Sequence, residues 1–371
     1  SALHKISSVY TKTQYTRYEI VQSLKDLYRW VLTANNNDQE FYHNYLELDV
    51  IPHVLHFLTL PNIMTDMEYV SLIGSIITYC TYGGPNGDTI DFAEKMAAKF
   101  LDLENDGIQI MRRANKVVYS GGNNSQELKA LNSIWTVFGN VVNLSCSSSS
   151  SNNSNNNDTI TGIDRNTILR LIDDALATLQ LLNGVDNECW LPRILFSIFN
   201  TIAFVLNTST ASSTSTSTTP LPLTADDFDF EGRDFFQTCI GAMKKDSDDG
   251  KHDDWDYEEE VWSAASCIFT CCLLNKLFSS DAQNDTNDND HHYLQLVVSF
   301  YVAYIKKSPN AAFKAQAFHF LRRASAVIGT NVMIEMTGLL STIGGVLDHT
   351  MDMHIDDITK EAAKALMKKL F

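Results

Sequence analysis

Apolar residues recur every three or four positions along most of this 371-residue chain, which is the spacing of an amphipathic α-helix. The alternation of Val, Ile and Thr between Asn-Gly or Asp-Gly turns, which indicates β-hairpins, is nearly absent. The pattern therefore predicts an all-α fold. Residues 18–32 show it well, with Tyr18, Val21, Leu24, Leu27, Tyr28, Val31 and Leu32 on one side of a helix.

Start and stop signals divide the pattern into helices. A helix from Val50 is expected to stop at Pro61. Asp66 is expected to cap an apolar helix that runs to Tyr82, and Ser125 a long helix to about residue 144. The C-terminal region is expected to form helices at 292–307, 310–328, 331–348 and 356–371.

Polar low-complexity segments interrupt the helices. Segments so rich in Ser, Thr, Asn or Asp cannot bury enough apolar surface to order themselves, so we expect disordered inserts. A compact bundle with one shared core would accommodate several inserts less readily than an elongated stack, so we expect a single helical repeat domain over residues 1–371. The inserts are expected at about 146–162, 208–224, 246–254 and 279–291.

Very apolar helices also recur at wide intervals. Each follows one or two more amphipathic helices, at a spacing of roughly 60 residues that falls toward 40–47 once the inserts are removed. One helical repeat cannot cover its own apolar face, and stacking buries that face against its neighbours. The pattern predicts a right-handed α-solenoid. The very apolar helices lie near residues 69–79, 128–142, 191–206 and 261–274.

Two stretches carry a resemblance to a known family. Residues 48–58, Leu-Asp-Val-Ile-Pro-His-Val-Leu-His-Phe-Leu, are similar to the pattern that leads into the second helix of an armadillo repeat, with Asp49 where the family has a small residue. Residues 130–140 resemble the third helix, and 196–200 and 262–266 do so more faintly. The resemblance implies an armadillo-like fold, with a HEAT-like or irregular α-solenoid as the alternative.

The same resemblance implies a peptide-binding groove. Third helices of armadillo proteins line a concave surface, where Asn side chains bind a peptide backbone and Trp rings pack on its side chains. The matching positions are Trp135, Asn140, Asn200 and Trp262. The alternative is that both Trp residues belong to the core and the Asn residues lie on an ordinary surface. The family's Trp-to-Asn spacing of four is not kept between Trp135 and Asn140.

The charge balance limits the partners. With 28 Lys and Arg against 45 Asp and Glu, the net charge is −17, which repels phosphate backbones and anionic lipids. We therefore expect no nucleic-acid or membrane partner and favour a basic protein or peptide; the alternative is that the acidity serves solubility alone. A candidate acidic docking patch for such a partner comprises Asp253, Asp254, Trp255, Asp256, Tyr257 and Glu258, which could equally be a solvated loop.

No catalytic constellation is evident. The chain has no Gly-rich phosphate loop, nucleophile elbow or zincin motif, so we expect no enzyme activity, no metal site and no cofactor. The seven Cys residues suit a reducing compartment, which predicts a cytoplasmic location, with the nucleus as the alternative. The sequence thus favours an interaction scaffold that binds a peptide or helical segment on a concave helical surface. The alternative function is a regulator of a small GTPase, as an exchange factor or chaperone.

Overall fold

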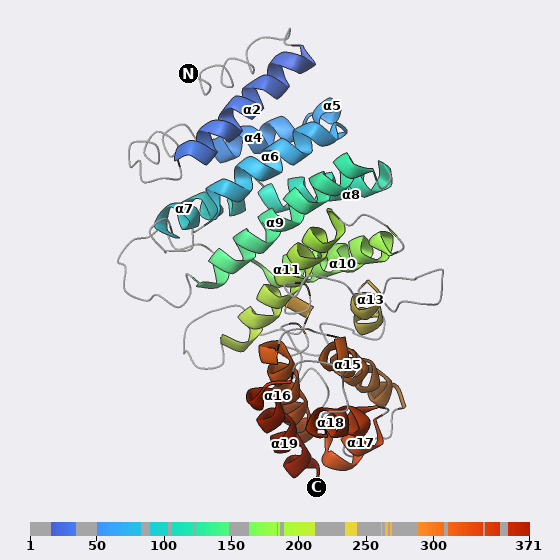
Figure 1. The fold of residues 1–371 in the computed structure, drawn as a ribbon. Coiled ribbons are helices and arrows are strands. Elements are labelled where there is room, and N and C mark those ends of the chain that lie inside the picture. Colours follow the sequence, from blue (N-terminus) through green and yellow to red (C-terminus); the bar gives the residue numbers. More distant parts are fainter. Residues whose placement is uncertain are drawn as a thin grey trace. The chain divides into compact units, whose positions relative to one another are not determined.

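The regular structure of the chain is helical, in agreement with the predicted all-α class (Figure 1). None of the residues that the structure describes is in a β-strand. The computed structural model describes residues 16–34, 50–82, 90–102, 106–121, 124–147, 163–183, 185, 189–211, 234–242, 261, 264–265, 268, 288–307, 311–336, 338–348 and 355–371.

The chain forms two compact units. The first comprises Ser1–Asp174, Val185–Val205 and Ser217–Pro220, and the second Ala175–Gly184, Leu206–Thr216 and Leu221–Phe371. The expectation of one continuous domain over residues 1–371 stays a prediction. The helices of the first unit are α2 (Arg17–Ala34), α4 (Val50–Leu58), α5 (Pro61–Met64), α6 (Met67–Cys80), α7 (Ile90–Leu101), α8 (Gly107–Gly121) and α9 (Ser125–Ser147), together with most of α10 (Arg165–Leu182) and α11 (Leu191–Ala211).

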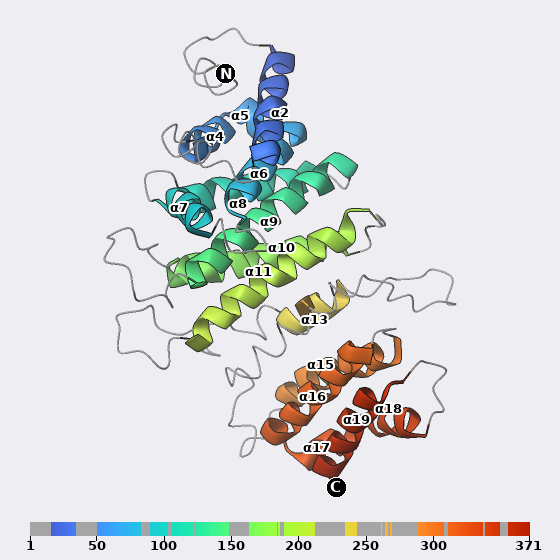
Figure 2. The same ribbon diagram turned by 60° about the vertical axis from the view of Figure 1, so that its left-hand side comes forward.

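Helices α2, α6 and α9 lie side by side in the first unit, and α4, α7 and α8 pack against them (Figures 1 and 2). Both α6 and α9 therefore have neighbours on several sides, which explains why their sequences are apolar around most of the helix. The core of this unit contains fully buried aromatic side chains, among them Phe100, Trp135, Phe138 and Phe199.

The second unit has its own core. The ring of Tyr301 in α15 stacks on that of Phe320 in α16, with 4.1 Å between the ring centroids. Helix α19 packs on α16, and the Thr359 hydroxyl donates to the Ala311 carbonyl at 2.9 Å. The helices of this unit are α13 (Phe235–Gly241), α15 (Asp288–Lys307), α16 (Ala311–Ile328), α17 (Thr330–Glu335), α18 (Leu339–Leu347) and α19 (Asp357–Leu370).

Several helix boundaries differ from the sequence-based prediction. Asp66 does cap α6, since its carboxylate accepts from the Glu68 N–H at 3.1 Å. Helix α9 is capped by Asn124 and not by Ser125, because the Asn124 side chain accepts from the N–H groups of Gln126 and Glu127. Pro61, which was expected only to end a helix, starts the short helix α5, where its missing N–H costs nothing.

The predicted helix at 331–348 is two helices. Gly338 has φ +82°, a left-handed conformation that breaks the helical path between α17 and α18. The helices also extend into three of the expected inserts: α9 reaches residue 147, α11 reaches 211, and α15 starts at Asp288. The remaining positions of the four inserts lie outside the described residues.

Candidate functional site

The contact between α6 and α9 is unusually close. A Cβ placed on Gly74 would lie 2.7 Å from the Ser133 Cβ, so only Gly lets the two helices approach this far. Beside this point the hydroxyls of Ser75 and Ser133 are 3.4 Å apart. Further along, the Asn140 side-chain amide donates to the Thr78 carbonyl at 3.2 Å. Both contacts advance in the same direction along the two helices, so α6 and α9 run parallel.

A second close contact joins α9 to α11. The hydroxyls of Thr136 and Ser197 are 3.1 Å apart, and the Ser197 hydroxyl also lies 3.5 Å from the Asn132 Oδ1. One turn later, the Thr201 hydroxyl lies 3.4 Å from the Trp135 carbonyl. A Cβ placed on Gly139 would lie 3.3 Å from the same Thr201 hydroxyl oxygen. These contacts also advance together, so α11 continues the row in parallel with α9.

The three parallel helices share a half-exposed face. On α9, Asn132, Thr136 and Asn140 are spaced by four residues and lie between the contacts to α6 and the contacts to α11. On α11, Phe196, Asn200 and Phe204 have the same spacing and a similar exposure. We call this surface the α6–α9–α11 strip; it consists of Ser75, Tyr79, Asn132, Thr136, Asn140, Phe196, Asn200 and Phe204.

The strip presents both hydrogen-bonding groups and rings. Among the described residues Asn200 makes no side-chain hydrogen bond, so its amide is open to a partner. The Asn140 amide nitrogen already donates to Thr78 and lies 3.5 Å from the Thr81 hydroxyl, which leaves its Oδ1 as the available group. The Tyr79 ring is held in an edge contact with Tyr28, at 5.7 Å between centroids.

Trp135 does not lie on this surface. Its side chain is fully buried and its ring packs edge-on against Phe138, with 5.3 Å between centroids. Trp135 directly precedes Thr136, and successive residues of a helix are rotated by about 100° around its axis. The indole therefore points into the core, while the Thr136 side chain lies on the strip. The structure thus agrees with the core interpretation of Trp135 and not with a contact to a partner.

Of the other expected site residues, Asn140 and Asn200 both lie on the α6–α9–α11 strip. Trp262 and the acidic patch at 253–258 lie outside the described residues. Sequence reasoning did not select Asn132 or Thr136, although both precede Asn140 at the four-residue spacing of one helix face. That spacing was the available signal.

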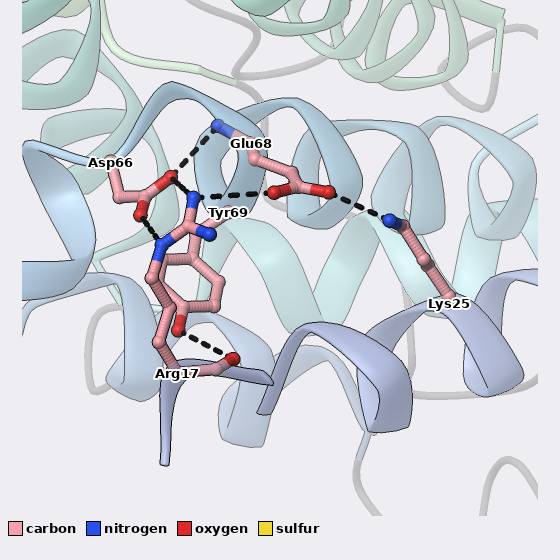
Figure 3. A network of polar contacts seen from close by, with 5 residues as sticks. All are labelled: Arg17, Lys25, Asp66, Glu68 and Tyr69. Atoms are coloured by element: carbon pink, nitrogen blue, oxygen red, sulfur yellow. Dashed lines mark hydrogen bonds and ion pairs between the residues drawn. The ribbon is translucent and has the colours of Figure 1, made fainter. Parts of the chain in front are cut away.

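A polar network joins α2 to the start of α6 (Figure 3). Arg17 donates from Nε to Asp66 at 2.6 Å and from Nη2 to Glu68 at 3.2 Å, and its guanidinium lies over the Tyr69 ring. Lys25 donates to the other Glu68 oxygen at 2.7 Å. The side chains point at one another and fasten α2 across the capped end of α6, so the network is structural.

The electrostatics of this network follow from the two cations. The hydrogen bond from Lys25 holds the pKa of Glu68 below its ordinary range, with Arg17 adding to the effect. Burial alone would raise the pKa of Asp66, but the hydrogen bond and charge of Arg17 outweigh it and lower that pKa. Both carboxylates are therefore ionised near neutral pH.

A buried ion pair joins α8 and α10 in the first unit. Arg112 on α8 donates from Nε to Asp174 on α10 at 2.5 Å, and Lys116 lies 3.9 Å from the second carboxylate oxygen. Arg112 also donates to the Gln109 side chain at 2.9 Å. Because each Asp174 oxygen faces a cation, the pair holds α8 and α10 together.

Clusters of metal ligands and membrane-spanning helices are both absent from the described residues. Within the described part of the chain, no group of three or more His, Cys, Asp or Glu side chains is arranged to hold a metal ion. Nor is any helix of that part long and apolar enough to cross a membrane.

Comparison with known proteins names no family. No family model and no curated protein matches the chain. Among solved structures, the chain is similar to an engineered protein studied by a structural genomics consortium, with 11% identity and a TM-score of 0.44. That match covers 100% of this chain and 78% of the other.

Proposed function

We propose that this chain is an armadillo-like helical repeat protein, an α-solenoid that works as an interaction scaffold. Its α6–α9–α11 strip would bind an extended peptide or a helical segment of another protein. The observation that carries the proposal is the strip itself, in which three parallel helices expose side chains at the same four-residue spacing beside one another.

The order of the helices supports the repeat. Helices α7, α8 and α9 form a three-helix succession, and α9 packs on both of the others and on α6. Helix α11 follows α10 and meets α9 through Ser197 and Thr201, as α9 meets α6 through Ser133 and Asn140. Equivalent helices thus repeat equivalent contacts, which is how stacked repeats cover their apolar faces.

The chemistry of the strip suits a peptide. An amide such as that of Asn200 can donate to and accept from a peptide unit, and the open Oδ1 of Asn140 can accept from a backbone N–H. Phe196, Phe204 and Tyr79 supply rings on which apolar side chains can pack. Alternating polar and aromatic groups along neighbouring helices can therefore bind the backbone and the side chains of one extended segment.

The net charge of the chain and the side chains of the strip act on a partner over different distances. The net charge of −17 attracts basic segments from a distance, and the patch at 253–258 would contribute to this attraction. At physiological ionic strength, charges are screened over about 8 Å, so the side chains on the strip decide which groups are bound in contact with it.

A selection experiment tests the proposal. Random peptides displayed on phage would be selected on the purified full chain, and the affinity of a recovered peptide would be measured by fluorescence anisotropy. Asn200→Ala is expected to weaken binding roughly tenfold, because the hydrogen bonds of one amide to a peptide unit are lost. Asn166→Ala, at an exposed position of α10, is the matched control and should leave the affinity unchanged. If both variants bind like the wild-type chain, the strip is not the binding surface.

A further inference from the structure

Two cations lie at the N-terminal end of the α6–α9–α11 strip. Lys129 is one turn before Asn132 on α9, and Arg193 is one turn before Ser197 on α11. Since Asn132 and Ser197 touch at 3.5 Å and the two helices run parallel, Lys129 and Arg193 lie on neighbouring helices at the same level. Packed helices are about 8–10 Å apart, so the two long side chains can reach adjacent groups of one ligand.

Both cations are exposed and available. Within the described part of the chain neither Lys129 nor Arg193 makes an ion pair. The Arg193 guanidinium lies 5.5 Å from the centroid of the Trp190 ring, which restrains it without using its hydrogen-bond donors. A cation held in this way keeps its donors free for a bidentate contact with a carboxylate.

Acidic side chains on the three helices are few and already engaged. Helices α6, α9 and α11 contain only Glu68 and Glu127. Glu68 is bound by Lys25 and Arg17, and Glu127 accepts from the Asn124 N–H at 2.8 Å in the cap of α9. Among the described residues, the charged side chains of the three helices that remain without an ion pair or a cap hydrogen bond are therefore Lys129 and Arg193, both opposite in sign to the net charge of the chain.

We propose that Lys129 and Arg193 form a carboxylate-binding subsite, so that the strip selects peptides with acidic residues at one end. This inference rests on the proposed function and gives it a chemical class of partner. The net charge of the chain would favour basic partners instead. Salt screens the distant acidic residues, so the side chains in direct contact with the ligand decide which charge is bound.

The composition of selected peptides gives the first test. Peptides recovered on the wild-type chain are expected to be enriched in Asp and Glu over Lys and Arg relative to the unselected library. Replacing the acidic residues of a recovered peptide by Asn or Gln should weaken its binding roughly tenfold, as loss of one or two charge-assisted hydrogen bonds predicts.

Charge-reversal variants identify the residues responsible. Lys129→Glu/Arg193→Glu should abolish the acidic enrichment and weaken the acidic peptide more than its amide version. Lys95→Glu/Arg113→Glu changes the net charge equally at exposed positions of α7 and α8 and should do neither. Circular dichroism would verify that both variants fold.

Three results would overturn the inference: no acidic enrichment, equal effects of the two charge reversals, or an acidic peptide that binds Lys129→Glu/Arg193→Glu normally. If peptides bind in an Asn200-dependent manner without preferring acids, the subsite is wrong and the proposed function stands. If no recovered peptide depends on Asn200, the proposed function fails first.

Discussion

The side-chain amide of Asn140 on α9 donates to the main-chain carbonyl of Thr78, 3.2 Å away in the last turn of α6. The Thr78 carbonyl also accepts from the N–H of Thr81, the residue that ends α6, at 3.2 Å. Asn140 therefore joins two neighbouring helices and adds a second donor at the C-terminal end of α6. The amide nitrogen of Asn140 thus helps to hold α9 against α6, and only its Oδ1 remains for a ligand.

Replacing Asn140 by Ala should destabilise the first unit. The Thr78 carbonyl would lose a hydrogen bond in a half-buried position, at a cost of about 1 kcal/mol. Urea unfolding followed by circular dichroism measures the change. Asn166→Ala, exposed on α10, is the control and should alter stability little. Equal stability of the two variants would show that the contact between Asn140 and Thr78 does not matter in solution.

The close approach of α6 and α9 predicts a larger effect at Gly74. A Cβ there would lie 2.7 Å from the Ser133 Cβ and 3.3 Å from the Ser133 carbonyl carbon, so Gly74→Ala should cost about 1–3 kcal/mol. The measurement is again urea unfolding.

A second substitution and a control make this test specific. Gly74→Ala/Ser133→Gly removes the clashing Cβ and should recover part of the loss. Gly344→Ala in α18, where a Cβ meets nothing within 4 Å, should stabilise the second unit by about 0.5–1 kcal/mol. A Gly74→Ala variant as stable as the wild type would contradict the close packing of α6 on α9.

Breaking the buried pair of Arg112 and Asp174 should be costly. Arg112→Met removes the nearer of the two cations from Asp174, whose side chain is 7% exposed and whose distance to Lys116 is 3.9 Å, and about 3 kcal/mol should be lost. The double variant Arg112→Met/Asp174→Leu also removes the buried carboxylate and should recover most of that loss. A double-mutant cycle measured by urea unfolding distinguishes this account from simple loss of packing, in which the two effects would add.

The network at the start of α6 predicts sensitivity to acid. The pKa values of Asp66 and Glu68 lie below their ordinary 3.8 and 4.5 in the folded chain. A depressed carboxylate pKa contributes stability that is present above the unfolded pKa and is lost as the pH falls through the folded one. Stability should therefore decline below about pH 5, the region where unfolded carboxylates begin to bind protons.

Arg17→Met tests this origin of the acid sensitivity. Without Arg17 both carboxylates titrate closer to their ordinary values, so the fall in stability between pH 5 and pH 3, the range set by ordinary carboxyl pKa values of about 4, should become shallower. Arg113→Met, at an exposed position of α8, is the matched control. Equal pH profiles for the two variants would mean that other carboxylates dominate the acid response.

The sequence predicted the helices far better than it predicted their ends and faces. The apolar spacing located α2, α6, α9 and α16 to within a few residues, because burial of a helix face imposes that spacing directly. The caps were harder, since Asn124 and Ser125 are both suitable residues and only the geometry shows that Asn124 accepts the bonds.

The site was predictable only in part. The resemblance to armadillo repeats pointed to Asn140 and Asn200, and both lie on the strip. It also pointed to Trp135, which is buried because one step along a helix turns a side chain by 100°. The close approaches at Gly74 and Gly139 and the position of Lys129 beside Arg193 depend on how helices distant in sequence pack, which the spacing within a single helix does not contain.

Hydrogen exchange measured by mass spectrometry on the full chain, with and without a selected peptide, shows whether a bound peptide covers the α6–α9–α11 strip. If the α6–α9–α11 strip binds the peptide, amide exchange should slow in α6, α9 and α11, while α7 and α19 serve as internal references and should not change. Protection confined to other segments, or no protection with saturating peptide, would contradict the account.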